Sequence, residues 1–224
     1  MLIECNNLVG ESVIRQTITA KSCSFGMGTN LSPAVNQLIA GHDCLIIKSQ
    51  AAEARVWVYS PTVIRINISL NFNKAGTSFA VIQKPDNVPV HTDDDDQIIV
   101  NAGDLVLNIN KSPLRFNFYT PSGQFLGGDD DRFGTSWEGE KVSNYRKLMP
   151  DERFIGLGEK TGPLDRRSQH YINWNTDAVD YHIKSDPLYK TFPFFIGLHS
   201  GRTYGLFLEN THRTFFDFGA STDN

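Results

Sequence analysis

Alternation of apolar and polar residues with a period of two is the feature of this sequence that most restricts its fold. In residues 54–59 the small aliphatic side chains occupy every second position. Residues 64–71 repeat the pattern with four aliphatic side chains, and Pro61 and Thr62 separate the two runs. Alternation of this kind puts one set of side chains on each face of an extended chain, as in a half-buried strand. The two runs therefore predict a β-hairpin.

Further strands are predicted where apolar runs return between turn segments, at residues 105–109, 115–119, 125–126, 194–198, 204–208 and 214–218. The runs at 194–198 and 204–208 flank a short segment containing Gly201, which indicates a second hairpin. The one predicted helix is short, beginning at Ser32 and Pro33 and ending at Ala40. Many short strands with frequent turns predict an all-β fold, an antiparallel β-sandwich with few or no helices. No linker or internal repeat interrupts the chain, so residues 1–224 are expected to form a single domain.

Charge and hydropathy exclude two classes of partner. The 21 Lys and Arg residues against 25 Asp and Glu give a net charge of −4, which is not the basic footprint of a nucleic-acid-binding protein. No apolar run approaches the length of about 18 residues that a membrane span needs. The first residues lack the basic segment and apolar stretch of a secretory signal, so a cytoplasmic location is expected.

No metal site or cofactor is predicted. The three cysteines (Cys5, Cys23 and Cys44) are too few and too scattered for a zinc site or a disulfide framework, and are expected to be free thiols in or near a core. The acidic run Asp93–Asp96 is expected to be a solvated loop. Neither this run nor 129–131 has the spaced ligands and the glycine of a calcium loop.

The segment 154–181 departs from the strand pattern. Gly156, Gly158 and Gly162 occur close together and suit tight turns or close approach of two backbones, but their spacing matches no nucleotide-binding motif. Residues 162–180 are predicted to be a long loop that projects from the sandwich. Nine residues out and nine back would reach roughly 30 Å, and loops of this length are frequently functional.

The candidate functional side chains lie in this loop. Trp174 can stack on a sugar ring or fill a core beneath the loop. Asp177 can accept hydrogen bonds from sugar hydroxyls or cap a turn. Arg166 and Arg167 are expected to pin the loop by pairing with Glu159 or Asp165.

Four motifs that occur in order resemble glycoside hydrolase family 31: GLGEKTGPLDRR (156–167), YINWNTD (171–177), DPLYKTFPFFIGL (186–198) and YGLFLENTHRTFFDFG (204–219). The similarity is to the N-terminal β-sandwich of the α-glucosidase-like members. Weaker similarity at 54–66, 110–126 and 133–142 extends it to roughly residues 40–219. No family motif is recognised in the first 40 residues. Ser168 departs from the glycine that is common in relatives after the arginine pair.

The resemblance implies a galactose-mutarotase-like supersandwich that packs on a catalytic (β/α)8 barrel, with one loop reaching the barrel's mouth. Asp177 occupies the position of the family's substrate-binding aspartate, and Trp174, Asn175 and Thr176 fall in the same loop. The resemblance thus implies α-linked oligosaccharides or glucosides as substrates and the barrel of the same enzyme as a partner.

The chemistry itself is expected to lie outside this sequence. A retaining glycosidase needs two carboxylates about 5–5.5 Å apart, and the family's nucleophile motif and barrel pattern are not found in these residues. No catalytic residue is therefore predicted, and the chain alone is expected to be inactive. Two alternatives remain: a free-standing carbohydrate-binding module, and an aldose 1-epimerase-like enzyme, which would need a histidine paired with a carboxylate.

Overall fold

The computed structural model of the chain describes residues 34–49, 52–70, 78, 80–85 and 88–221, together with the backbone of two strands at 2–5 and 12–17. In these residues every regular element is a β-strand, which confirms the predicted all-β class. The described part of the chain contains no helix with the length and apolar character of a membrane span.

The strands form three sheets. The largest contains, in spatial order, β14 (Arg153–Gly158), β16 (Thr191–His199), β17 (Arg202–Leu208), β1 (Leu2–Cys5), β6 (Val63–Ser69), β5 (Glu53–Ser60), β4 (Leu45–Ser49) and β3 (Val35–Ala40). A second contains β11 (Phe125–Gly128), β10 (Leu114–Tyr119), β9 (Val106–Lys111), β8 (Gln97–Asn101) and β7 (His91–Asp93). The third contains β12 (Thr135–Glu138), β13 (Lys141–Lys147), β2 (Ser12–Thr17), β18 (Thr214–Asp217) and β15 (His170–Asn173).

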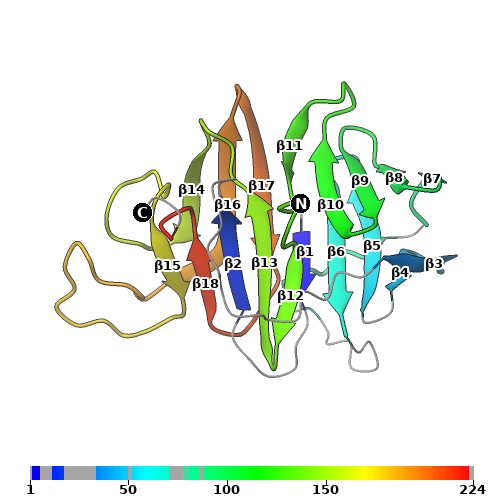
Figure 1. Cartoon of the computed structure of the whole chain (residues 1–224). Coiled ribbons are helices and arrows are strands. Elements are labelled where there is room, and N and C mark those ends of the chain that lie inside the picture. Colours follow the sequence, from blue (N-terminus) through cyan, green and yellow to red (C-terminus); the bar gives the residue numbers. More distant parts are fainter. Residues whose placement is uncertain are drawn as a thin grey trace.

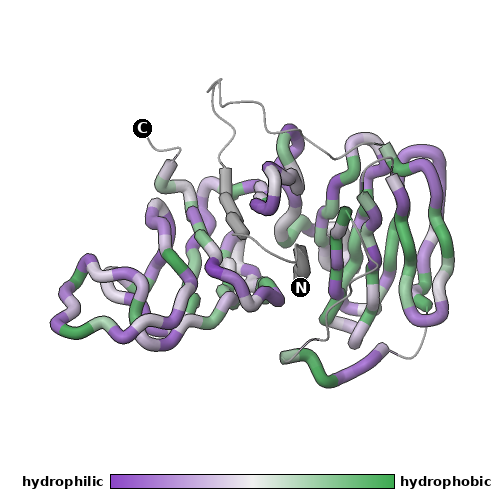
Figure 2. Tube along the Cα trace, turned by 90° about the horizontal axis from the view of Figure 1, so that it is seen from below, coloured by the Kyte–Doolittle hydropathy of each residue, from purple (hydrophilic) through white to green (hydrophobic). Residues whose placement is uncertain are grey.

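The eight-stranded sheet forms one layer, and the two five-stranded sheets lie side by side against it as the other (Figure 1). Neighbouring strands are antiparallel, as predicted, except that β1 and β2 run parallel to both of their neighbours. Apolar and polar residues alternate along the strands (Figure 2). The apolar set faces inward, and the buried hydrophobic side chains form one continuous cluster between the layers.

An aromatic cluster joins the layers near the candidate site. Phe195 of β16 lies 6.2 Å from Phe216 of β18 and 5.2 Å from Phe218, measured between ring centroids. Phe154 of β14 lies 4.7 Å from Phe218. All four rings are almost completely buried. Edge-to-face and tilted packing of this kind adds to the stabilisation from burial and holds β14 and β16 against β18.

Both predicted hairpins are confirmed. β5 pairs with β6 and β16 pairs with β17, each antiparallel across a short turn. Ala54 and Val56 are fully buried while Trp57 and Tyr59 face outward, as the alternation predicted. The runs at 105–109, 115–119, 125–126 and 214–218 also lie on strands, with bounds that differ by one to three residues.

The predicted helix ending at Ala40 is wrong. Residues 35–40 are β3, which pairs antiparallel with β4 from Val35↔Ser49 to Ala40↔Leu45. The backbone groups that a helix would satisfy internally are satisfied here by the neighbouring strand, and that neighbour overrides a weak local preference. Ser32 and Pro33 lie outside the described residues.

The loop predicted at about 162–180 is placed differently by the structure. β15 occupies its middle and pairs with β18 from His170↔Asp217 to Asn173↔Thr214. The segment that projects is residues 174–190, called the projecting loop below, which is the yellow-to-orange loop at the left of Figure 1. The pairing joins residues more than forty positions apart, so no local pattern in the sequence reveals it.

Gly156 and Gly158 serve close backbone approach, as predicted. Their φ values are 142° and 77°. A Cβ atom on Gly156 would lie 2.5 Å from the carbonyl oxygen of Phe194, and one on Gly158 would lie 2.6 Å from that of Lys190. Glycine at these positions lets β14 bend against β16 at the base of the projecting loop.

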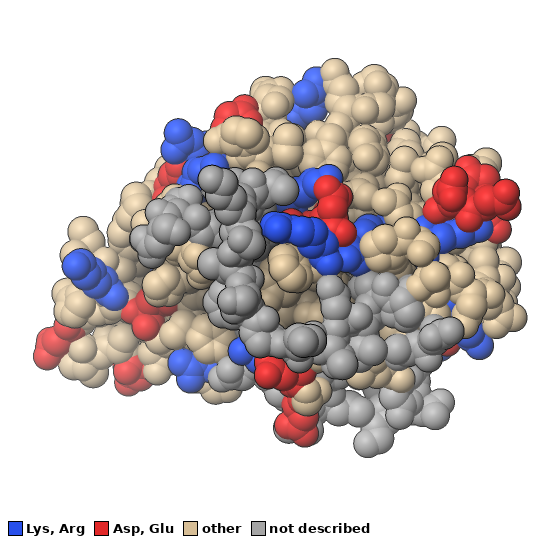
Figure 3. All heavy atoms as spheres, viewed as in Figure 1, with Lys and Arg blue, Asp and Glu red and all other residues tan. Residues whose placement is uncertain are grey.

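The two acidic runs behave differently. Asp93–Asp96 is exposed, as predicted, and forms the acidic group at the end of the molecule where β7 and β8 lie (Figure 3). Elsewhere on that face charges of both signs are interspersed. Asp129 and Asp130, in contrast, are buried. Cys44 is a buried free thiol, as predicted, whereas the side chains of Cys5 and Cys23 are outside the described residues.

Candidate functional site

The projecting loop has a locked base. Lys160 donates hydrogen bonds from Nζ to Asp186 Oδ1 at 2.7 Å and to the carbonyl oxygen of Ile172 at 2.6 Å. The second carboxylate oxygen of Asp186 accepts the backbone N–H of Ile172. The Lys160 side chain is fully buried and that of Asp186 is 18% exposed. Lys160, in the segment that precedes β15, thus binds both the strand that leads into the projecting loop, at Ile172, and the returning arm of the loop, at Asp186.

Burial lowers the pKa of Lys160, while the hydrogen bond and the charge of Asp186 oppose that change. An ammonium group in this position depends on its partner, because an unpaired buried charge is strongly unfavourable. The lock also joins two of the sequence motifs, since Lys160 belongs to GLGEKTGPLDRR and Asp186 begins DPLYKTFPFFIGL. The two motifs are therefore in contact in the folded chain and belong to one site.

The arginine pair pins the preceding segment, but not through the carboxylates that were predicted. Arg166 donates to the carbonyl oxygens of Pro163 at 2.6 Å and Thr161 at 3.3 Å, and its guanidinium lies 5.1 Å from the ring centre of Tyr171. Arg167 donates to the carbonyl oxygens of Met149 and Glu152. The guanidinium groups therefore hold the turns through backbone oxygens rather than through carboxylates.

Asp165 is used within the same turn. Its Oδ1 accepts hydrogen bonds from the backbone N–H groups of Phe154 and Arg167. Its Oδ2 accepts a hydrogen bond from Arg153 Nη1 at 2.8 Å. Burial would raise the pKa of Asp165, but these hydrogen bonds outweigh it, so the pKa is lowered. The PLDRR segment is thus a structural support for the loop.

Two of the predicted substrate-binding residues have structural roles at the loop base. Asn175 Oδ1 accepts the backbone N–H of Thr191 at 2.8 Å and its hydroxyl at 2.9 Å. The backbone N–H of Thr176 donates to the carbonyl oxygen of Leu188 at 3.0 Å. Both contacts close the loop across its two arms.

The other two predicted residues face solvent. Trp174 is 48% exposed, so it does not fill a core beneath the loop. Asp177 is exposed and makes no side-chain hydrogen bond or ion pair with the described residues, so it does not cap a turn there. Its carboxylate is therefore accessible to a ligand or to a neighbouring polypeptide segment.

A hollow of about 310 Å³ lies beside the loop base, and we call it the loop-base pocket; its lining comprises Asn173, Trp174, Asn175, Thr191, Pro193, Asn210, Thr211, His212 and Thr214. It brings Trp174 and Asn175 together and leaves Thr176 and Asp177 outside. Asn173 was not identified as a candidate from the sequence. A strand pattern would have indicated it: Tyr171 and Asn173 are two positions apart, so they share one face of a strand. That face is buried, and a side-chain amide is unusual at a buried position.

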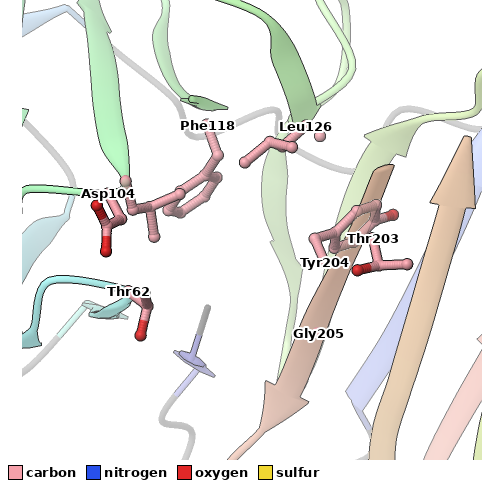
Figure 4. A pocket seen from close by; sticks show the side chains of 9 residues that line it. Thr62, Asp104, Phe118, Leu126, Thr203, Tyr204 and Gly205 are labelled. Atoms are coloured by element: carbon pink, nitrogen blue, oxygen red, sulfur yellow. The ribbon is translucent and has the colours of Figure 1, made fainter. Parts of the chain in front are cut away.

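A second hollow of about 240 Å³ lies between β11 and β17, where Phe118 and Leu126 face Tyr204 (Figure 4). The Tyr204 hydroxyl is already bound to Glu152 at 2.6 Å. The remaining polar groups come from separate turns, at Thr62, Asp104 and the start of β17. This hollow is a gap between sheets with no convergent set of free polar groups.

The epimerase alternative needs a histidine and a carboxylate that reach a ligand. His199 and Glu152 are neighbours in the core, 5% and 1% exposed. His199 Nε2 contacts the carbonyl oxygen of Leu126, and the Glu152 carboxylate also accepts the backbone N–H of Met149. Burial raises the pKa of Glu152. These groups are enclosed and engaged with the protein, which disfavours an epimerase site here.

Residues 53–217, from β5 through β18, match the family described as the glycosyl hydrolase 31 N-terminal galactose mutarotase-like domain. The chain belongs to glycoside hydrolase family 31. The match includes all four motifs up to Asp217 and every strand of the candidate site. The resemblance read from the sequence is confirmed, and the region of the family that is matched is its N-terminal domain.

Three family 31 relatives illustrate the similarity. The chain is 31% identical over 174 residues to alpha-glucosidase 2 of Bacillus thermoamyloliquefaciens, covering 75% of this chain and 22% of that protein. It is 39% identical over 82 residues to an alpha-glucosidase of Saccharolobus solfataricus, covering 37% of this chain and 12% of that protein. A Flavobacterium johnsoniae GH31 dextranase complexed with isomaltotriose superimposes with a TM-score of 0.78 at 28% identity, covering 86% of this chain and 24% of that one. This chain therefore spans less than a quarter of the length of these relatives.

Proposed function

We propose that this chain is the N-terminal domain of a retaining, α-glucosidase-like glycoside hydrolase that acts on α-linked glucosides or related sugars. The family membership and the two α-glucosidase relatives support this substrate class, as does the dextranase bound to an α-linked trisaccharide. In this proposal the domain packs on the catalytic barrel and the projecting loop supplies part of the substrate site.

The observation that carries the proposal is the contrast between the base and the tip of the projecting loop. The base is fixed by the buried Lys160–Asp186 pair. The tip exposes Val179 and Ile183, at 77% and 74%, and the same loop carries Asp177, whose carboxylate has no partner among the described residues. Exposed aliphatic side chains on a rigidly held loop indicate a surface that another part of the enzyme covers. Asp177 would then reach the substrate from that surface.

The outer face of β16 supports packing on a neighbouring domain. Phe192, Phe194 and Ile196 point outward in succession and are 59%, 41% and 38% exposed. The strand begins where the projecting loop ends, so this apolar row continues from the loop base along one side of the large sheet. A contiguous apolar row of this kind marks an interaction surface. The catalytic barrel is the proposed partner.

The test is Asp177→Ala in the polypeptide that joins this domain to its catalytic domain. A hydrogen bond from a sugar hydroxyl to a carboxylate contributes about 1.5–3 kcal/mol, so kcat/KM on an α-glucoside should fall roughly 10- to 150-fold per bond. The melting temperature should stay near that of the wild type, because the carboxylate is exposed and supports no described contact. Asp95→Ala is the matched control, since Asp95 is an exposed aspartate in the acidic loop that precedes β8.

Unchanged kcat/KM in Asp177→Ala would remove this residue from the substrate site. The isolated 224-residue chain gives a second arm of the same test. It should release no nitrophenol from an aryl α-glucoside above a heat-inactivated control, because the proposal assigns both catalytic carboxylates to the barrel. Turnover by the isolated chain would contradict the assignment of both catalytic carboxylates to the barrel.

A further inference from the structure

We infer that the loop-base pocket is a binding site for a neutral pyranose sugar, in which the side-chain amide of Asn173 binds the hydroxyls. The pocket lies at the sheet end of the projecting loop and does not include Asp177. It is therefore an accessory saccharide site, distinct from the contribution that the loop tip is proposed to make to the barrel.

Asn173 is the main evidence for a ligand. Its side chain is 5% exposed, and neither Nδ2 nor Oδ1 has a hydrogen-bond partner. Its cross-strand neighbour Thr214 does not serve it, because the Thr214 hydroxyl is bound to Asn210 Nδ2 and to the carbonyl oxygen of His212. A buried amide with both groups unpaired destabilises a fold and therefore needs an explanation. Both amide atoms have almost no accessible surface, so a rotation of the side chain toward the pocket is needed; two adjacent sugar hydroxyls can then satisfy the amide, because each hydroxyl both donates and accepts.

The remainder of the lining has the chemistry of a sugar site. Trp174, about half exposed, offers a ring face against which the apolar side of a pyranose can pack. Asn210, Thr211 and His212 add polar groups to the lining. Among the described residues no Asp, Glu, Lys or Arg lines the pocket, so the described lining offers no charge that would compensate a charged ligand. A neutral, polyhydroxylated molecule fits this lining better than a phosphate or a carboxylate.

The size and rigidity of the pocket agree with this ligand. Its volume of about 310 Å³ is near the lower end of the range for small-molecule sites, which is roughly 300–1,000 Å³, and suits one or two sugar rings. Asn175 is held by Thr191, and Asn210 by Thr214, so two of the walls are fixed before a ligand binds. A preformed site loses little conformational freedom on binding.

Methyl α-glucoside, maltose and isomaltose titrated separately into the 224-residue chain, followed by NMR, would test the inference. At least one sugar should give saturable shifts of the Asn173 side-chain amide and the Trp174 indole signals. Asn173→Leu preserves the approximate volume but removes the amide. It should weaken binding at least about tenfold, since two hydrogen bonds are lost. The same variant should raise the melting temperature of the sugar-free chain, because the unpaired buried amide is gone.

Two controls distinguish this site from the proposed function. Tyr181→Ala removes an exposed aromatic ring of the projecting loop that does not line the pocket, and should leave binding unchanged. Asp177→Ala should also leave binding to the isolated chain unchanged, although it is predicted to impair catalysis in the joined polypeptide. The two ideas can therefore fail independently.

Absence of saturable shifts with all three sugars would overturn the inference, as would wild-type affinity in Asn173→Leu. If Asn173→Leu does not fold, Trp174→Ala replaces it, because Trp174 is half exposed and its loss should be tolerated by the fold. Wild-type affinity in Trp174→Ala would equally reject the site.

Discussion

Lys160→Met tests whether the projecting loop is held by a buried ion pair. The substitution keeps most of the aliphatic stem and removes the ammonium group that binds Asp186 and the carbonyl oxygen of Ile172. Removing one member of a buried pair costs about 3–5 kcal/mol, because the remaining charge is left uncompensated. Asp186 retains 18% exposure and therefore some hydration, so the lower figure of about 3 kcal/mol applies.

For a chain of this size, 3 kcal/mol corresponds to a fall in melting temperature of roughly 6–12 °C. Guanidinium denaturation would give the change in the free energy of unfolding, and hydrogen exchange of the backbone amides of 177–185 would show whether the loop opens locally. Lys184→Met is the matched control, since Lys184 is an exposed lysine on the same loop. The double variant Lys160→Met/Asp186→Asn should be more stable than Lys160→Met, because it no longer buries a lone carboxylate. A melting temperature for Lys160→Met equal to that of Lys184→Met would refute the reasoning.

Two further predictions concern the turn that precedes β15. Ser168 has a φ of 57°, a left-handed conformation that glycine adopts without strain. Ser168→Gly should therefore have a free energy of unfolding about 0.5–1 kcal/mol above that of Ser168→Ala, which also lacks the hydroxyl; the difference is the left-handed penalty of alanine less the extra chain entropy of glycine. Denaturant titration of the two variants measures this, and a less stable glycine variant would contradict it. The lowered pKa of Asp165 means that its contribution to stability is present above the unfolded-state pKa and is lost as the pH falls through the lower folded-state pKa. Asp165→Asn should be less stable than wild type at neutral pH and should lose less stability on acidification, whereas parallel pH profiles of the melting temperature would exclude this role.

Strands could be predicted from the sequence where a regular apolar pattern is bounded by turn residues. In β5 and β6 the alternation of apolar and polar residues is strict, whereas β16 and β17 are apolar runs. In both pairs the turn between the strands is short, so both the strands and their pairing could be predicted. β3 was mistaken for a helix because its pattern is short and its identity depends on β4. The strands β12 and β13 were not identified, although residues 141–147 show a regular alternation of burial in the structure.

The candidate site was located by resemblance and only partly resolved by it. The motif YINWNTD led to Trp174, Asn175, Thr176 and Asp177, and the structure leaves Trp174 and Asp177 exposed while using Asn175 to close the loop base. Asn173 was overlooked, because an amide at an inward strand position can equally be satisfied by the core. Only the tertiary structure shows that this amide has no partner among the described residues.

What the sequence by itself determined is the all-β class, the main hairpins and the family, since these depend on local periodicity and on residue identity. The tertiary structure decided which residues meet. The Lys160–Asp186 pair spans 26 positions, and the β15–β18 pairing that divides the predicted loop spans more than forty. It also decided that Asp93–Asp96 is solvated whereas Asp129, in an equally acidic run, is buried beside Arg146 with a raised pKa caused mainly by burial. Contacts between distant residues form only when the sheets pack. The composition of a short segment therefore does not determine which residues will pack against it.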